Sequence, residues 1–206
     1  MTATGSQKTK RANGIETQNA LLTAAGSIFS RMAYSQARLK DIVDEAGISQ
    51  GSLYFHFGNK DDVAYAVLAV QQERMGAVLS SALNAPGTGL DRILSVMEGL
   101  ANLIASDELV QAGIRLSTQP GTGLDLRSAT PYADWVEYTA IVLRDGVTDG
   151  SMAPDLDTRA ASELLNEIFV GAQTLAGIED RWTSLPRRIA AARSAIRSLL
   201  TSSARD

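Results

Sequence analysis

Side chains that could bind a polyanion gather in one short segment, residues 48–62, with the sequence ISQGSLYFHFGNKDD. The hydroxyl of Tyr54 and the ring N–H of His56 can each donate a hydrogen bond to a phosphate oxygen, and Lys60 adds a positive charge. The segment holds the chain's only histidine. The chain has four Phe and five Tyr residues, and three of these nine aromatic residues lie in the segment. Such contacts fix a protein on a nucleic acid backbone without selecting a base sequence. We therefore predict phosphate contacts here, although a lone histidine or tyrosine often serves only a local hydrogen bond.

Catalysis is the main rival function, and the residue types argue against it. The chain has one histidine, no cysteine, no Gly-rich phosphate loop and no histidine pair at zinc-binding spacing. Its carboxylates, such as Asp61, Asp107 and Asp157, fall mostly at helix starts, in loops or on exposed faces. We expect a protein that is not an enzyme, with no catalytic residue, no metal ion and no cofactor.

The charge is distributed unevenly along the chain. Residues 1–60 carry seven Lys and Arg against four acids, a balance of +3, and the other 146 residues carry twelve against nineteen, a balance of −7. This asymmetry predicts that the N-terminal part meets a polyanion. No apolar run approaches the roughly 20 residues of a membrane helix, and the N-terminus lacks the apolar core of a signal peptide. We expect a cytoplasmic protein without membrane association.

Helices must position these residues, because apolar side chains recur at helical spacing and no segment alternates as a strand would. Gly47 is placed to end one helix, and Ser49 and Asn59 are placed to cap the next two. The sequence predicts an all-α protein: a three-helix helix-turn-helix head, residues 1–59, and a larger ligand-binding and dimerisation body, residues 60–206. The predicted helices cover about 15–32, 39–46, 50–56, 60–83, 90–105, 108–117, 131–148, 158–178 and 185–202.

Two short helices joined by a Gly-containing turn form the pattern LKDIVDEAGISQGSLYFHF, which is typical of a helix-turn-helix. Small residues at the start of the second helix, Ser49, Gly51 and Ser52, leave it slim enough for the major groove of DNA. We expect Phe55 and Phe57 to close the core of the head against the following helix.

Residues 15–62 resemble the DNA-binding head of the TetR family of bacterial repressors, through AGISQGSLYFHFGNKDD at 46–62, the register at residues 39–42 and Phe29. The resemblance implies a homodimer that binds a pseudo-palindromic operator in double-stranded DNA, and a body that senses a small molecule. It places at the DNA face Arg38, Ser49, Gln50, Gly51, Ser52, Tyr54, His56 and Lys60.

The body is similar to the γ-butyrolactone receptors of actinobacteria in two stretches, VQAGIRLSTQPG at 110–121 and TPYADWVEYT at 130–139. This similarity implies a small hydrophobic effector of the γ-butyrolactone type. A TetR-type repressor that responds to a drug, a fatty acyl compound or another hydrophobic ligand is the alternative.

Two residues are candidates for ligand binding. Trp135 shares a helical stripe with Thr139 and Val142, so its indole is expected to face inward, as pocket wall or as core. Gln71 interrupts an apolar row between Val67 and Met75, so it lies either at the water edge of that row or beside a polar ligand atom.

The last two predicted helices have apolar faces broader than one helix pair needs to bury. A two-fold dimer packed as a four-helix bundle would cover the excess. We predict interface positions at Leu165, Phe169, Ala172 and Ile196.

Overall fold

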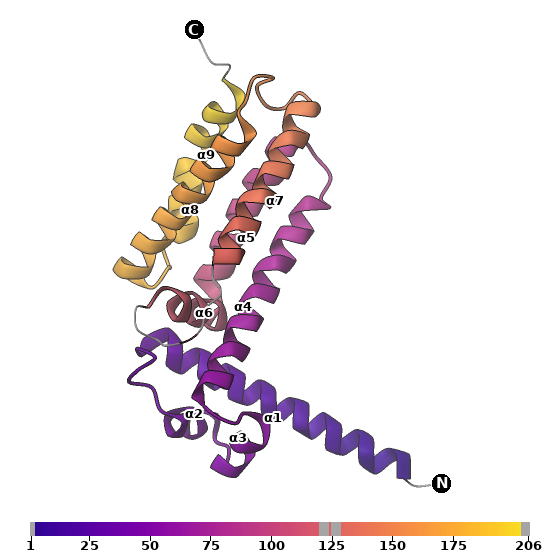
Figure 1. Cartoon of the computed structure of the whole chain (residues 1–206), viewed down its shortest axis with the longest axis vertical. Helices are drawn as coiled ribbons and strands as arrows, with labels where there is room; N and C mark the ends of the chain where they lie inside the picture. The colour runs from indigo at the N-terminus through magenta and orange to yellow at the C-terminus, as the bar shows by residue number, and fades with distance from the viewer. Residues whose placement is uncertain (1–2, 120–123, 125–128, 203–206) are drawn as a thin grey trace. The chain divides into compact units, whose positions relative to one another are not determined.

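The computed structural model describes residues 3–119, 124 and 129–202 of the 206-residue chain. Within these ranges the secondary structure consists of nine α-helices and contains no strand, so the predicted all-α class is confirmed (Figure 1). The helices are α1 (Ala3–Arg31), α2 (Leu39–Ala46), α3 (Gln50–His56), α4 (Lys60–Leu83), α5 (Gly89–Ser106), α6 (Glu108–Thr118), α7 (Ala129–Thr148), α8 (Thr158–Asp180) and α9 (Leu185–Thr201).

Most helix boundaries agree with the sequence-based ones to within about two residues. The exception is α1, which begins at Ala3 rather than near residue 15. The expected start was placed where the periodic pattern of apolar residues begins. A polar segment without proline can nevertheless extend a helix whose later part is held by packing.

The chain divides into two compact units. Unit 1 comprises Met1–Arg74 and Asp107–Leu126, and unit 2 comprises Met75–Ser106 and Arg127–Asp206. Among the described helices, α4 alone has residues in both units. The predicted functional boundary at residues 59 and 60 stays a prediction, since these units are defined by packing alone.

Unit 1 is built around α1, which packs along α6 and also contacts α2 and α3. Its core takes fully buried side chains from several helices: Leu21, Ala25, Phe29, Ile42, Leu53, Val63, Val67 and Ala112. The helices α4 and α6 approach closely at Gly113, where an added Cβ atom would overlap the side chain of Gln71. The helix-turn-helix therefore shares one core with α1, α4 and α6.

Unit 2 is a helical bundle in which α5 packs against α7 and α9, and α8 packs against the same two helices (Figure 1). The start of α5 lies directly on the end of α7, because a Cβ atom on Gly89 would overlap the backbone of Gly146. The backbone N–H of Gly89 also donates a hydrogen bond to the carboxylate of Asp149, at 2.7 Å. None of the described helices combines the length and the apolarity that crossing a membrane requires.

Candidate nucleic-acid interface and candidate ligand pocket

The turn between α2 and α3 has the geometry that its sequence predicts. Gly47 adopts the left-handed conformation with φ of 65°, which glycine reaches without a steric cost. The N–H of Ile48 donates to the carbonyl of Val43 at 3.1 Å, which closes the end of α2. Ser49 then caps α3 by accepting a hydrogen bond from the N–H of Ser52, at 3.2 Å. These local bonds define a helix-turn-helix with α3 as its second helix.

The predicted DNA-face residues lie on the solvent side of this motif. Exposed side chains or backbone are found at Arg38, Ser49, Gln50, Gly51 and Tyr54, whereas Ser52, His56 and Lys60 are half-buried. The structure thus makes these positions accessible, and their contacts with DNA stay a prediction.

The expected place of Phe55 in the core is wrong. Its side chain is 84 % exposed, whereas Phe57 is 5 % exposed and packs in the core as predicted. The reason is the helical period: Leu53 is fully buried on the inner face, and position 55 falls about 200° away from it around the helix axis. Phe55 instead lines an open groove with Ser52 and His56 of α3 and Gly14 and Thr17 of α1.

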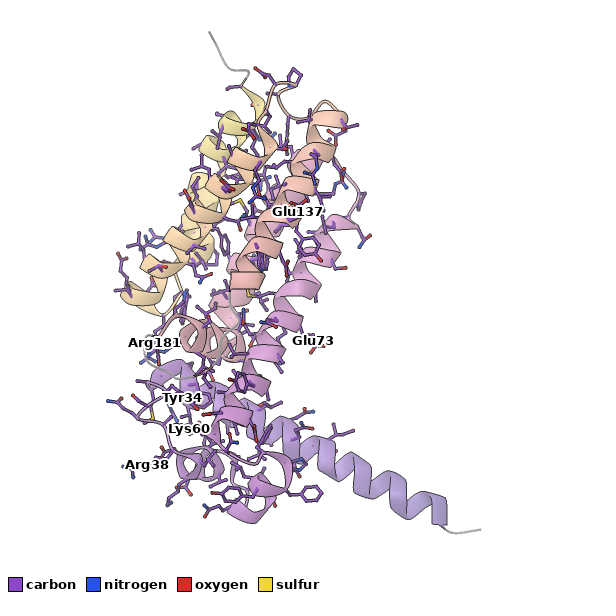
Figure 2. The ribbon with its side chains drawn as sticks, viewed as in Figure 1. Tyr34, Arg38, Lys60, Glu73, Glu137 and Arg181 are labelled. Atoms are coloured by element: carbon purple, nitrogen blue, oxygen red, sulfur yellow. The ribbon has the colours of Figure 1, made fainter. Side chains whose placement is uncertain are left out.

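Lys60 is committed to contacts inside unit 1. Its ammonium donates hydrogen bonds to the backbone carbonyls of Tyr34, at 2.8 Å, and Ala37, at 3.1 Å, and lies 4.2 Å from the centroid of the Tyr34 ring (Figure 2). An ammonium has three N–H donors, so one is left for a phosphate. Lys60 therefore ties the segment between α1 and α2 to the start of α4, a role that its sequence position did not reveal.

Tyr34 is the centre of this connection. Burial and a hydrogen bond to the Asp61 carboxylate raise the pKa of its phenol, so the hydroxyl stays a donor to that carboxylate. Its backbone N–H donates to the side-chain carbonyl of Gln119, at 3.0 Å, where α6 ends. The position of the helix-turn-helix is thus fixed by bonds to both α4 and α6.

Replacing Lys60 with methionine should loosen this connection. Two carbonyls would lose a charged donor, and each such loss lowers the free energy of unfolding by about 1–3 kcal/mol. Amide hydrogen exchange, followed by mass spectrometry, should become faster in residues 34–47. Lys40→Met is the matched control, because its exposed ammonium pairs with Asp44 on the same helix. Equal exchange in the two variants would show that Lys60 does not hold this segment.

Unit 2 contains a cavity of about 120 Å³ between helix faces that are mostly apolar. Trp135, half-buried on α7, forms part of its wall, together with Phe169 of α8 and Met75 of α4. The residues that line it do not include Gln71, which packs against Gly113 in unit 1. The ligand role predicted for Trp135 thus has a cavity beside it, whereas the structure places Gln71 in another environment.

Three polar side chains interrupt the apolar wall, and the sequence-based reasoning named none of them as a ligand-binding group. They are Thr139 of α7 and Asn166 and Gln173 of α8. The side-chain N–H₂ of Asn166 donates to the carbonyl of Ser162, at 2.8 Å, and to the hydroxyl of Thr139, at 3.3 Å. A signal was available, since Asn166 shares a face of α8 with the apolar residues Phe169 and Val170 at helical spacing. Among the described side chains, no group of three or more His, Asp or Glu is arranged to hold a metal ion.

Three of the four interface residues predicted on α8 and α9 are largely buried within the single chain, and the interface itself stays a prediction. Leu165 and Ile196 are each 2 % exposed and Phe169 is 9 % exposed within the single chain, so little of these side chains is left for a partner. Only Ala172 of the four predicted interface residues is half-buried. The large apolar side chains that α8 and α9 leave exposed are Leu164, Val170, Leu175, Ile178 and Leu199.

A helix-turn-helix in one unit and an apolar cavity with a few polar groups in another define the class of helix-turn-helix regulatory proteins with a separate effector domain. Residues 21–67 match the family model for bacterial regulatory proteins of the tetR family, and residues 87–201 match that for the tetracyclin repressor-like C-terminal domain. The chain belongs to the TetR family.

The chain is similar to a curated receptor protein and to a solved structure. The chain is 25 % identical over 181 residues to the A-factor receptor protein of Streptomyces griseus, a match that covers 88 % of this chain and 62 % of that protein. The chain therefore spans less than two thirds of the length of this relative. A solved structure described as the molecular basis for control of antibiotic production by bacterial hormones has a TM-score of 0.79 and 26 % identity, over 91 % of this chain and 99 % of that one.

A γ-butyrolactone receptor structure, of an ArpA-like protein, shares the fold. Its TM-score is 0.68 at 24 % identity, over 87 % of this chain and 98 % of that one. At this identity the likeness concerns the fold alone.

Proposed function

We propose that the chain is a ligand-responsive repressor of transcription. It binds a pseudo-palindromic operator in double-stranded DNA as a homodimer, in the cytoplasm, and a small hydrophobic effector releases it. The observation that carries the proposal is the α2–turn–α3 motif, with its short residues exposed at the start of α3. The family membership and the balance of +3 over residues 1–60 support it.

A γ-butyrolactone is the effector class that we favour. The apolar wall suits an alkyl chain, and the Thr139–Asn166 pair offers hydrogen-bonding groups that a lactone carbonyl or hydroxyl could use. The named relatives, an A-factor receptor and a protein studied with bacterial hormones, point toward a signalling molecule. A drug or fatty acyl compound would suit the apolar wall equally, but a purely aliphatic ligand would make no use of the hydrogen-bonding groups of Thr139 and Asn166.

Selection of DNA by the purified protein tests the proposal. Rounds of binding to a random duplex library should enrich an inverted repeat whose half-site centres lie about 34–36 Å apart, or a multiple of this distance. A γ-butyrolactone added to the complex should then release the duplex. Failure to enrich any duplex would contradict the repressor function. Enrichment without release by any lactone would contradict only the effector class.

The dimer contact, by our proposal, is an apolar stripe on α8 together with α9. Leu164, Ile168, Gly171, Leu175 and Ile178 follow one another at helical spacing on α8. Leu175 is 51 % exposed and Ile178 is 77 % exposed, so the single chain leaves this stripe largely uncovered. A two-fold partner would pair the stripe with itself.

Replacing Ile178 with glutamate should weaken the dimer by at least about a hundredfold. A charge buried without a partner costs several kcal/mol, and a two-fold interface contains the position twice. Sedimentation velocity over a range of concentrations measures the change. Ile141→Glu is the control, since Ile141 is also an exposed apolar residue of unit 2 but lies on α7. If both variants stay dimeric, the interface lies elsewhere.

A further inference from the structure

Phe55 is the most exposed large apolar side chain among the described residues, at 84 %. Among the described aromatic rings, the one that Phe55 contacts is that of the neighbouring His56, edge to face with centroids 5.2 Å apart. Removing an exposed phenyl ring from water is favourable, so Phe55 is available to contact an apolar group of a partner.

The surroundings of Phe55 leave it prominent on α3. Gly51 lies one helical turn earlier on the same face and has no side chain, and Ser49 and Ser52 beside it are short. The buried Leu53 holds the opposite face of the helix against the core. Phe55 is therefore the most exposed apolar side chain of α3, beside the open groove that it lines with Gly14 and Thr17 of α1.

A DNA major groove is the occupant that fits this face. An α-helix with its side chains is about 10–12 Å across and the major groove is about 12 Å wide, so a helix such as the seven-residue α3 fits within it. The second helix of a helix-turn-helix lies in that groove. Residues 1–60 carry a net charge of +3, which favours the approach of the phosphate backbone.

A phenyl ring has no donor or acceptor for a phosphate or for a polar base edge. The apolar group that base edges present in the major groove is the C5 methyl group of thymine. We propose that Phe55 is a specificity-determining residue that selects thymine in each operator half-site by contacting this methyl group. The inference rests on the proposed DNA-binding function and adds a residue that the sequence had placed in the core.

Replacing thymine with deoxyuridine tests this contact, because it removes the C5 methyl group and keeps the base pair. The probe is the duplex enriched from the random library, with each symmetry-related thymine pair replaced in turn, and binding is measured by fluorescence anisotropy. For one of these thymine pairs, wild-type affinity should fall about fourfold when one half-site is changed and about fifteenfold when both are changed. These factors correspond to the loss of one buried methyl group in each half-site.

Phe55→Ala should bind the thymine and deoxyuridine duplexes equally at that pair, and Phe55→Leu, which keeps an apolar side chain, should retain part of the difference. The resulting double-mutant cycle separates this contact from any effect of deoxyuridine on DNA shape. A new selection with Phe55→Ala should lose the preference for thymine at that position. Thermal unfolding of both variants verifies that the exposed substitution leaves the fold intact.

Two outcomes would overturn the inference while the DNA-binding function stands. One is a wild-type protein that binds every deoxyuridine duplex as tightly as the thymine duplex. The other is a Phe55→Ala variant that loses as much affinity as the wild type when thymine is replaced with deoxyuridine. The phenyl ring would then not contact the methyl group. Enrichment of no duplex at all would instead reject the proposed function itself.

Discussion

Replacing Gly47 with valine is expected to weaken operator binding by roughly 30- to 1,000-fold. The left-handed conformation at this turn, with φ of 65°, costs a residue with a side chain about 1–2 kcal/mol. A valine would relieve this strain by turning the chain, and α3 would then leave the position in which it fits the groove. A dimer holds two such turns, so DNA binding must restore both, at about 2–4 kcal/mol in total.

Gly150→Val is the matched control for this effect. Gly150 has φ of 77°, and a Cβ atom added at either glycine would meet no atom within 4 Å, so both substitutions act through the backbone alone. Gly150 belongs to unit 2, between α7 and α8, and its substitution should leave operator affinity unchanged. Titration of the selected duplex by anisotropy, with thermal unfolding of each variant, gives both quantities. Equal operator affinity in the two variants would mean that the α2–α3 turn does not position the DNA-binding surface.

Replacing Trp135 with alanine should lower effector affinity by at least about tenfold while leaving operator binding intact. The indole forms part of the cavity wall, and aromatic side chains contribute large apolar areas to binding. An effector at 100 times its Kd raises the free energy of unfolding of the wild-type protein by about 2.7 kcal/mol. A tenfold loss of affinity removes about 1.4 kcal/mol of this stabilisation.

Tyr138→Ala serves as the control for the Trp135 variant. Tyr138 is an aromatic residue of α7 three positions further along, 46 % exposed, and it is not part of the cavity lining. Thermal stabilisation by a lactone panel, and release of the selected duplex against lactone concentration, should separate the two variants. Identical stabilisation of the wild type and Trp135→Ala would remove Trp135 from the binding site. A tenfold loss of operator affinity when the effector binds requires about 1.4 kcal/mol of coupling between the two sites, a common size for an allosteric effect.

The sequence by itself determined the helix-turn-helix and the helices, apart from the start of α1. The end of α2 at Gly47 and the cap of α3 at Ser49 follow from contacts within four residues, so their positions were predictable. The same local rule could have placed Phe55, because the helical period puts it opposite Leu53. Treating the neighbouring Phe57 and Phe55 alike, as two aromatic residues, led to the wrong prediction.

Only the tertiary structure decided which partners the side chains meet. The ammonium of Lys60 bonds to carbonyls 23 and 26 residues earlier, and Tyr34 bonds to Gln119, 85 residues away. The spacing of apolar residues likewise indicated that Leu165 and Phe169 share a face of α8, but not that this face would line a cavity with Trp135. A helix forms through bonds between near neighbours, whereas the choice of what covers each face depends on many weak contacts with distant segments. Those distant contacts are set by the packing of the whole unit, which no local pattern contains.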